Sequence, residues 1–257
     1  MGGLQDFGED TDVNPSDKVA LVTGAARRVG RAIALELAES GYDIAIHFNS
    51  SEQEAREAAE IIRQKGRRAA LVRGELADPN VPERILREVV AELGRLDVLV
   101  NSASSFDRVA FEQVDAAAWE RTFAVNTIAP ALLARTAAPI MRAAGGGRIV
   151  NMIDIMAGRA VKGYAAYLAS KAALASITRS LALELAPEIT VNGVAPGIAV
   201  FPEYYDQATR ERLVSRVPLG RPGSPEEVAR LVRFLVMEGD YITGAIIPID
   251  GGRSVRM

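Results

Sequence analysis

The chain contains no cysteine and only one histidine, His47, among its 257 residues. Without thiols there can be no disulfide, no thiolate metal ligand and no cysteine nucleophile, and one imidazole cannot build a histidine-rich metal site. The sequence therefore predicts no bound metal and excludes several classes of enzyme.

The sequence also lacks an excess of charge of one sign. The formal net charge is -3, and basic residues are scattered among acidic ones, so no basic block is available to follow a phosphate backbone. The first residues have neither the basic start nor the apolar stretch of a secretory signal, and no later run approaches the ~18 apolar residues of a membrane span. We expect a cytoplasmic protein with a disordered N-terminal tail over residues 1–16, and neither nucleic acid nor membrane as a partner.

Apolar segments alternate with amphipathic ones along the rest of the chain, without repeats or low-complexity stretches, which predicts a single domain over residues 17–257. Short runs rich in Val, Ile and Leu predict buried strands at 18–23, 42–48, 68–74, 95–103, 147–153, 189–196 and 245–250. Helical patterns lie between them at 28–40, 51–65, 82–93, 115–143, 164–186 and 224–236. This alternation predicts an α/β fold: a doubly wound Rossmann sheet of seven parallel strands with helices on both faces.

The segment "TGAARRVG", residues 23–30, follows the first predicted strand and opens a helix, which is where such folds bind a dinucleotide phosphate. Gly24 allows a sharp turn, Gly30 allows close packing of the helix, and the helix start attracts phosphate. Arg28 stands where the middle glycine is expected.

The end of the second predicted strand has no carboxylate for a ribose 2′-hydroxyl; it reads Phe48, Asn49, Ser50. Small donors there and two loop cations, Arg27 and Arg28, predict NADPH rather than NADH as the cofactor. The alternative is that both arginines only solvate the start of a helix.

Tyr167 and Lys171 are four residues apart and share one face of a predicted helix. A lysine beside a phenol favours the phenolate, which predicts a lowered pKa for Tyr167 and a role as proton donor and acceptor. The alternative is a surface contact without chemistry. Tyr164 is a less suitable candidate because Leu168 stands four residues after it.

These motifs, with "NSA" at 101–103, Asn126 and "VAPG" at 194–197, resemble the short-chain dehydrogenase/reductase family from about residue 17 onward. The resemblance implies that Tyr167 is the acid/base, that Lys171 holds the nicotinamide ribose, and that Asn126 anchors a proton-relay water. It also implies a homotetramer.

Four features together are similar to the pteridine reductases of that family: Arg28, "NSASSF" at 101–106, "NMID" ending at Asp154, and "RSLALELAPEITVNGVAPG" at 179–197. Asp154 replaces the serine found in the general family. In the subgroup the loop arginine bonds both the pyrophosphate and the pterin, so the resemblance gives Arg28 that role and implies that Phe106 stacks on the pterin while Ser104 bonds it.

The resemblance implies two sets of binding residues. For the cofactor they are Gly24, Arg27, Arg28, Val29, Gly30, His47, Phe48, Asn49, Ser50, Glu75, Leu76, Asn101, Ser102, Ala103, Tyr167, Lys171, Pro196, Gly197 and Ile198. For the substrate they are Arg28, Ser104, Phe106, Asp154, Tyr167 and Pro196. Three positions depart from the pattern, because Glu75 replaces Asp, Ser102 replaces a second Asn, and Ser50 replaces an arginine. The loop 198–216 would cover the substrate, and Arg256 would reach a neighbouring subunit's site.

Three hypotheses for the activity stay open. The first is NADPH-dependent reduction of pterins, most simply of 7,8-dihydropterins to tetrahydropterins, with oxidised pterins or dihydrofolate as further substrates. The second is a generic carbonyl or 3-oxoacyl reductase, in which Asp154 is an incidental substitution. The third is a nucleotide-sensing scaffold without turnover, whose usual mark is a damaged Tyr/Lys pair.

Overall fold

The computed structural model describes residues 18–256, and within them one parallel sheet has the strand order β3-β2-β1-β4-β5-β6-β7. Its strands are β1 (Val19–Val22), β2 (Asp43–Phe48), β3 (Ala69–Arg73), β4 (Val98–Asn101), β5 (Gly147–Met152), β6 (Ile189–Pro196) and β7 (Ile246–Ile249). The predicted doubly wound sheet is confirmed. The strand order reverses between β1 and β4, and ligands of such folds bind at the carboxyl ends of the strands there.

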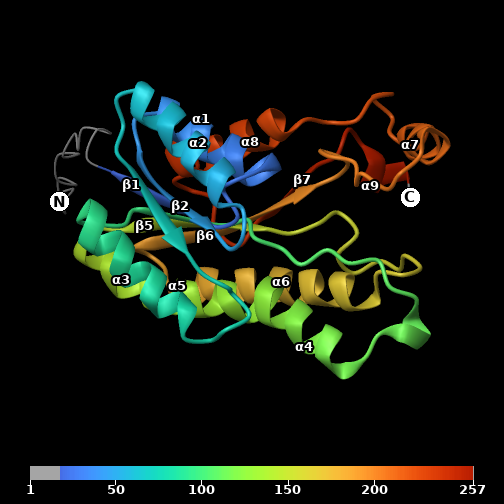
Figure 1. Ribbon diagram of the computed structural model, residues 1–257, viewed down its shortest axis with the longest axis horizontal. Coiled ribbons are helices and arrows are strands. Elements are labelled where there is room, and N and C mark those ends of the chain that lie inside the picture. The colour runs from blue at the N-terminus through green and yellow to red at the C-terminus, as the bar shows by residue number, and fades with distance from the viewer. Residues whose placement is uncertain (1–17, 257) are drawn as a thin grey trace, which may run out of the picture.

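Helices cover both faces of the sheet. In Figure 1, α1 (Arg28–Glu39), α2 (Glu52–Gln64) and α8 (Pro225–Met237) lie on one face, and α3 (Val81–Leu93), α5 (Ala129–Ala143) and α6 (Ala165–Glu184) lie on the other. Each face has its own apolar cluster. The central strands β1, β2 and β4 are buried along their whole length, which explains why they read as unbroken apolar runs.

The predicted helix over 115–143 is not uniform. It consists of α4 (Ala116–Phe123), a π-helical turn, η3 (Ala124–Ile128), and then α5. By length and composition alone the stretch Ala116–Ala143 could cross a membrane, with a mean hydropathy of 1.2 and 44% of the window buried. This corrects the expectation that no segment is long and apolar enough, although α5 packs on α3 and the sheet as a core helix does.

Three short elements were not predicted. The loop 198–216 contains α7 (Gln207–Val214), whose start is capped by the Asp206 side chain, and two further short helices are η2 (Phe111–Gln113) and α9 (Arg253–Arg256). In Figure 1, α7 and α9 lie together at one end of the molecule. These elements surround the carboxyl end of the sheet, so they shape the site described next.

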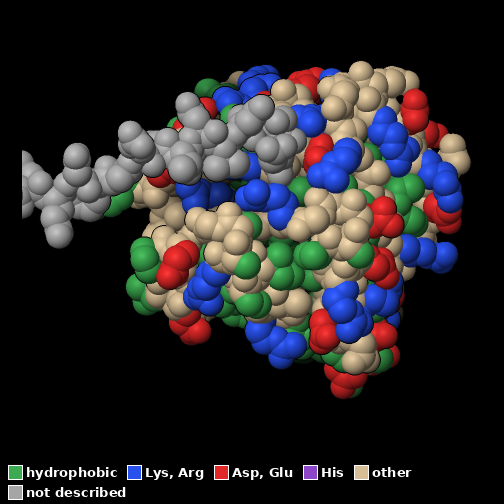
Figure 2. Space-filling model, turned by 90° about the vertical axis from the view of Figure 1, so that its left-hand side faces the viewer, with side chains coloured by type: hydrophobic (Ala, Val, Ile, Leu, Met, Phe, Trp, Pro, Cys, Tyr) green, Lys and Arg blue, Asp and Glu red, His purple; other side chains and the backbone are tan. Residues whose placement is uncertain are grey.

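Acidic and basic side chains are interspersed on the face shown in Figure 2. The exposed ion pairs on α2 and α3, such as Arg56 with Glu52 and Arg87 with Glu83, follow the helical i, i+4 spacing. The tail predicted over residues 1–16 lies outside the described residues.

Candidate active site

The loop after β1 is shaped to approach a ligand closely. Gly24 has φ +64°, and a Cβ there would lie 3.0 Å from the Cα of Ala103. A Cβ on Gly30 would lie 2.2 Å from the carbonyl oxygen of Gly24, so only glycine lets α1 pack on the turn. No side chain caps α1, which leaves its first N–H groups available to an anion. These residues fit the pyrophosphate of a dinucleotide.

Arg28 keeps the backbone of the glycine it replaces. Its φ is +53°, which costs an L-residue other than glycine about 1–2 kcal/mol. Its guanidinium is exposed and lies 3.4 Å from Glu203, in the segment that follows β6. Arg27 is also exposed, and its guanidinium lies 3.6 Å from the Glu54 carboxylate of α2. Val29, which follows Arg28, is half-buried. Strain of this kind is retained where a side chain has a function.

The buried side chain of His47 supports the phosphate loop. It is 2% exposed; its Nδ1 accepts a hydrogen bond from the Gly24 N–H at 3.2 Å, and its Nε2 lies 3.0 Å from the Gly74 carbonyl oxygen. Burial lowers the pKa of His47 to about 4, so the ring is neutral and Nε2 carries the proton. The resemblance implies that His47 binds the cofactor. In the structure its imidazole contacts the phosphate loop, so any effect of His47 on the cofactor acts through that loop.

The ends of β2 and β3 form the expected ribose and adenine side. Asn49 and Ser50 are exposed, Phe48 and Leu76 are buried, and the Asn49 amide donates to the Glu75 carboxylate. Asn49 and Ser50 are thus accessible to a ligand and Phe48 and Leu76 are not; the contact with the ribose stays a prediction.

The end of β4 is fixed to the end of β1. The Thr23 hydroxyl accepts hydrogen bonds from the N–H groups of Ser102 (2.9 Å) and Ala103 (3.0 Å). Asn101 is buried and donates to Asn151 at 2.8 Å, while its Oδ1 is buried without a partner among residues 18–256. The structure thus brings the two strand ends together where the sequence predicted a cofactor.

At the end of β6, Pro196, Gly197 and Ile198 are half-buried beside β7. The Gly197 N–H donates to the Ile249 carbonyl at 2.9 Å. This turn lies at the carboxyl end of β6, and its contact with the cofactor stays a prediction.

Asp154, Tyr167 and Lys171 meet as predicted. The Tyr167 hydroxyl donates to Asp154 Oδ2 at 2.8 Å, and the Met156 N–H donates to Asp154 Oδ1 at 2.7 Å. Lys171 is 2% exposed, its Nζ donates to the Met152 carbonyl at 2.7 Å, and Nζ lies 5.9 Å from the centre of the Tyr167 ring.

The pKa of Tyr167 differs from the prediction. Burial and the Asp154 carboxylate raise it well above the usual value for a phenol, so the expected lowering by Lys171 is wrong for this structure. Burial also raises the pKa of Asp154, although the Met156 N–H, Tyr167, Lys171 and Arg253 oppose this. Burial lowers the pKa of Lys171 to about 8, and Asp154 opposes it. The phenol of Tyr167 is therefore held in its protonated form, donating to the Asp154 carboxylate.

Asn126 lies in the π-helical turn and is fully buried. Its Oδ1 accepts from the Ser105 N–H at 2.8 Å, and its Nδ2 donates to the Ser105 carbonyl at 2.9 Å and to the Ser170 hydroxyl at 3.0 Å. The amide therefore fixes the segment after β4 to α6; the relay water stays a prediction. π-turns are frequent at functional sites because the extra residue redirects a side chain.

Phe106 lies beside Tyr167. Its ring centre lies 4.7 Å from that of Tyr167 in an edge contact and 5.1 Å from that of Tyr164 in a stacked one. Ser104, two residues earlier, is exposed and bonds only the Ser105 carbonyl within the described chain. Both residues, to which the resemblance assigns substrate contacts, lie on the segment that follows β4.

Sequence reasoning missed the contacts that join Tyr164 and Arg28 to the segment after β6. Tyr164 bonds Tyr204 and Tyr205 through their hydroxyls, and Glu203 pairs with Arg28. The only signal available in the sequence was the concentration of aromatic residues at 201–205, which does not specify what they contact.

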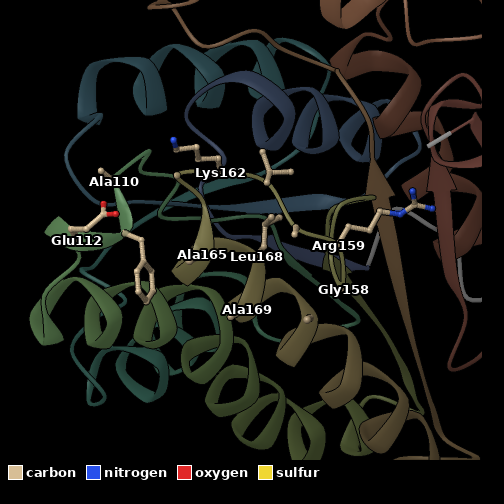
Figure 3. A pocket seen from close by; sticks show the side chains of 13 residues that line it. Ala110, Glu112, Gly158, Arg159, Lys162, Ala165, Leu168 and Ala169 are labelled. Atoms are coloured by element: carbon tan, nitrogen blue, oxygen red, sulfur yellow. The ribbon is translucent and has the colours of Figure 1, made fainter.

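A cavity of about 510 Å³ lies on the other side of α6 (Figure 3). Its lining includes Ala165, Leu168, Ala169 and Ala172, together with Phe111. Asp154, Tyr167 and Lys171 do not line it, so this cavity is separate from those three side chains.

Fold and site together define a dinucleotide-binding oxidoreductase with a Tyr/Lys pair at the carboxyl end of the sheet. A family model described as "Enoyl-(Acyl carrier protein) reductase" matches residues 24–254. The chain belongs to the short-chain dehydrogenase/reductase family.

Three relatives show how closely the family is matched. A 3-oxoacyl-[acyl-carrier-protein] reductase FabG of Staphylococcus aureus is 35% identical over 239 residues, covering 91% of this chain and 97% of the relative. The crystal structure of acetoin dehydrogenase from Enterobacter cloacae has a TM-score of 0.86 at 36% identity, covering 94% of this chain and 97% of that one. A blue fluorescent protein from a metagenomic library, in complex with NADPH, has a TM-score of 0.86 at 35% identity, covering 93% and 99%. The relatives support the broader of the two predicted reductase activities; membership of the pteridine reductases stays a prediction.

Proposed function

We propose that this protein is an NADPH-dependent reductase that adds hydride to a C=O or C=N group of a small substrate, with Tyr167 as the proton donor. The observation that carries the proposal is the buried hydrogen bond from the Tyr167 hydroxyl to Asp154, with Lys171 next to the ring. The cofactor, when bound, supplies the hydride. The intact Tyr/Lys pair argues against a sensing scaffold without turnover.

The residues divide the work as follows. Tyr167 Oη would donate its proton to the atom that receives negative charge, Asp154 Oδ2, which accepts the hydrogen bond of the phenol, would orient that hydroxyl, and solvent would return a proton to Tyr167 afterwards. Lys171 is placed to bond a ribose hydroxyl and to keep positive charge near the phenol. Loop residues around Gly24 and Gly30 would hold the pyrophosphate.

NADPH is favoured over NADH by the side chains at the end of β2. The exposed positions there are Asn49 and Ser50, and Arg27 is nearby on the loop. A relative of similar fold binds NADPH. Comparable catalytic efficiency with NADH would contradict this preference.

For the substrate class, the relatives favour a carbonyl compound. They include 3-oxoacyl and acetoin enzymes and a cis-4-hydroxycyclohexanecarboxylate dehydrogenase of Sinomonas cyclohexanicum, each of which is named for a carbonyl or alcohol substrate. This supports the generic reductase over the pterin reductase as the first proposal.

Specific observations support dihydropterin reduction as the second candidate. Asp154 bonds the proton donor where the general family has serine, Arg28 is retained at φ +53° despite its strain, and Phe106 offers a ring beside Tyr167. A flat, hydrogen-bonding heterocycle suits an aromatic wall with polar edges.

One experiment separates the two. Oxidation of NADPH is followed at 340 nm with an aliphatic ketone, a 3-oxoacyl thioester, a dihydropterin and dihydrofolate, for the natural protein and for Asp154→Ser. Pterin turnover that Asp154→Ser abolishes, with ketone turnover retained, supports the pterin reductase; ketone turnover alone supports the generic reductase.

We also propose a homotetramer, as the family resemblance implies. The exposed side of α6 carries small residues, Ala165, Ser176 and Ser180, which allow a second helix to approach closely. Light scattering coupled to size exclusion tests the assembly, and a monomer at micromolar concentration would contradict it.

A further inference from the structure

Tyr164 lies one helical turn before the proton donor, and its hydroxyl lies between two others. The oxygen is 2.9 Å from the Tyr205 hydroxyl and 3.2 Å from the Tyr204 hydroxyl. Both partners belong to the segment 198–216, which we call the lid. Because a phenol can donate one hydrogen bond and accept others, Tyr164 can satisfy both contacts at once.

The ring of Tyr164 holds the opposite wall. Phe106 stacks on it with 5.1 Å between centres and 25° between planes, while the edge of Phe106 meets Tyr167. Phe106 is 42% exposed, so its ring is not fixed by burial in the core. Its orientation depends on the two tyrosines of α6.

Within the lid, two contacts of Arg210 hold the segment around Tyr205. The Arg210 Nε donates to the Tyr205 carbonyl at 3.0 Å, and the guanidinium lies 5.5 Å from the centre of the Phe201 ring. No residue of α7 is buried. The lid therefore has little core packing of its own, and the hydroxyl contacts with Tyr164 are its connection to the catalytic helix.

We propose that Tyr164 is a positioning residue that holds two segments next to Tyr167, Phe106 after β4 and the lid, against the start of the helix that carries Tyr167. Burial of its side chain makes the hydroxyl contacts necessary, since a phenol oxygen without a partner in a desolvated place is unfavourable. Tyr164 has no place in proton transfer here, because Asp154 bonds Tyr167 instead.

This assignment rests on the proposed reductase activity for its substrate, and it refines the substrate class. Phe106, Tyr164, Tyr167 and Tyr205 bring aromatic rings from three separate segments to one place. A cleft of this kind accepts a flat ring better than a branched aliphatic ketone. We therefore expect cyclic, planar substrates to depend on Tyr164 more than small aliphatic ketones do.

The test is Tyr164→Phe, which removes the hydroxyl and keeps the ring that stacks on Phe106. We expect KM for a dihydropterin or a planar cyclic ketone to rise by about 5- to 30-fold, as two lost hydrogen bonds would give. The dissociation constant of NADPH should stay within about twofold, and kcat should change less than KM. Tyr241→Phe, at a fully exposed phenol, is the matched control and should change nothing.

A second measurement does not depend on activity. Limited trypsin digestion of the NADPH-bound protein can cut at three arginines of the lid, Arg210, Arg212 and Arg216. Tyr164→Phe should raise the rate of cleavage there several-fold and Tyr205→Phe, which keeps the contact with Tyr204, should raise it less; the double variant should be no faster than Tyr164→Phe alone.

The outcomes are distinct. If Tyr164→Phe leaves lid cleavage unchanged, the positioning role is wrong, whatever the substrate. If cleavage rises while no carbonyl or pterin substrate is turned over by the natural protein, the proposed function is wrong and the lid contact stands. A fall in kcat without a rise in KM would also overturn the proposal, because it would assign Tyr164 to the chemical step.

Discussion

The two halves of the site are held together by different kinds of contact. On the cofactor side, each connection joins one side chain to backbone N–H groups: the Thr23 hydroxyl accepts from the N–H groups of Ser102 and Ala103, and the His47 ring accepts from that of Gly24. On the substrate side, side chains make them, through the ring of Phe106 and the exposed pair of Arg28 with Glu203. A bond from a side chain to a backbone N–H constrains the identity of only one of its two residues, whereas a contact between two side chains constrains both. We therefore expect the cofactor half to be shared with other members of the family, and the substrate half to determine the specificity of this chain.

The strongest way to separate the halves is Tyr167→Phe. The ring and its edge contact with Phe106 remain, but the proton donor is lost, so kcat should fall by the ~10²–10⁴-fold of a general acid. NADPH binding, measured by fluorescence titration, should be nearly unchanged. Near-full turnover in this variant would mean that another group supplies the proton.

Acid should weaken the cofactor half through His47. The pKa in the folded protein is about 4, below the usual 6.5, so the unfolded chain binds the proton more tightly. The contribution of His47 to stability is thus complete above pH 6.5 and is lost as the pH falls toward 4, by about 3 kcal/mol in total.

His47→Asn removes this titration and keeps an acceptor for Gly24. Urea unfolding at several pH values should show the natural protein more stable at pH 7 and the difference shrinking toward pH 4. Two parallel curves would show that the ring is not buried in its neutral form.

Arg28→Gly tests whether Arg28, which lies on the cofactor loop and pairs with the lid residue Glu203, binds the substrate. Loss of the charge should weaken substrate binding about 10- to 100-fold if the guanidinium makes a charge-assisted hydrogen bond to the substrate. The same change should raise the free energy of unfolding by about 1 kcal/mol, because glycine adopts a φ of +53° without strain. Arg27→Gly is the control, since its φ is -141° and there is no strain to relieve. A destabilised Arg28→Gly protein would contradict the strain argument.

The smallest effect is expected from removing residues 254–257. Arg256 donates to the Ser215 carbonyl at the end of the lid, and the Ser254 carbonyl accepts from Arg159 after β5. No residue of α9 is buried, so the protein should stay folded while the substrate KM rises about two- to fivefold. An unchanged KM would show that this segment does not support the substrate half; the predicted reach of Arg256 into a neighbouring subunit stays a prediction.

The sequence predicted the cofactor half well because its determinants are local. β1, β2 and β4 are buried on both faces and read as apolar runs, and the loop at Gly24 and Gly30 needs glycine for steric reasons that act within a few residues. The Tyr167/Lys171 pair was predictable from helical spacing alone.

The substrate half was predicted less well because its determinants are distant in the chain. Tyr164 and Tyr205 are 41 positions apart, and no spacing rule relates them. The pKa of Tyr167 was predicted in the wrong direction because burial and Asp154 outweigh the lysine, and burial is a property of the whole fold. The π-turn at Asn126 interrupts a sequence that has ordinary helical periodicity.

The left-handed backbone at Arg28 has a consequence for how such enzymes diverge. A glycine at this position would occupy the same backbone conformation, so exchange between the two residues needs no remodelling of the loop. A single-base change in an arginine codon yields a glycine codon. Arg28 can therefore be exchanged for glycine without a change in the phosphate-binding loop. One mutational step in an ancestor is enough to gain or lose the arginine, and with it part of the substrate range, while the cofactor site stays functional.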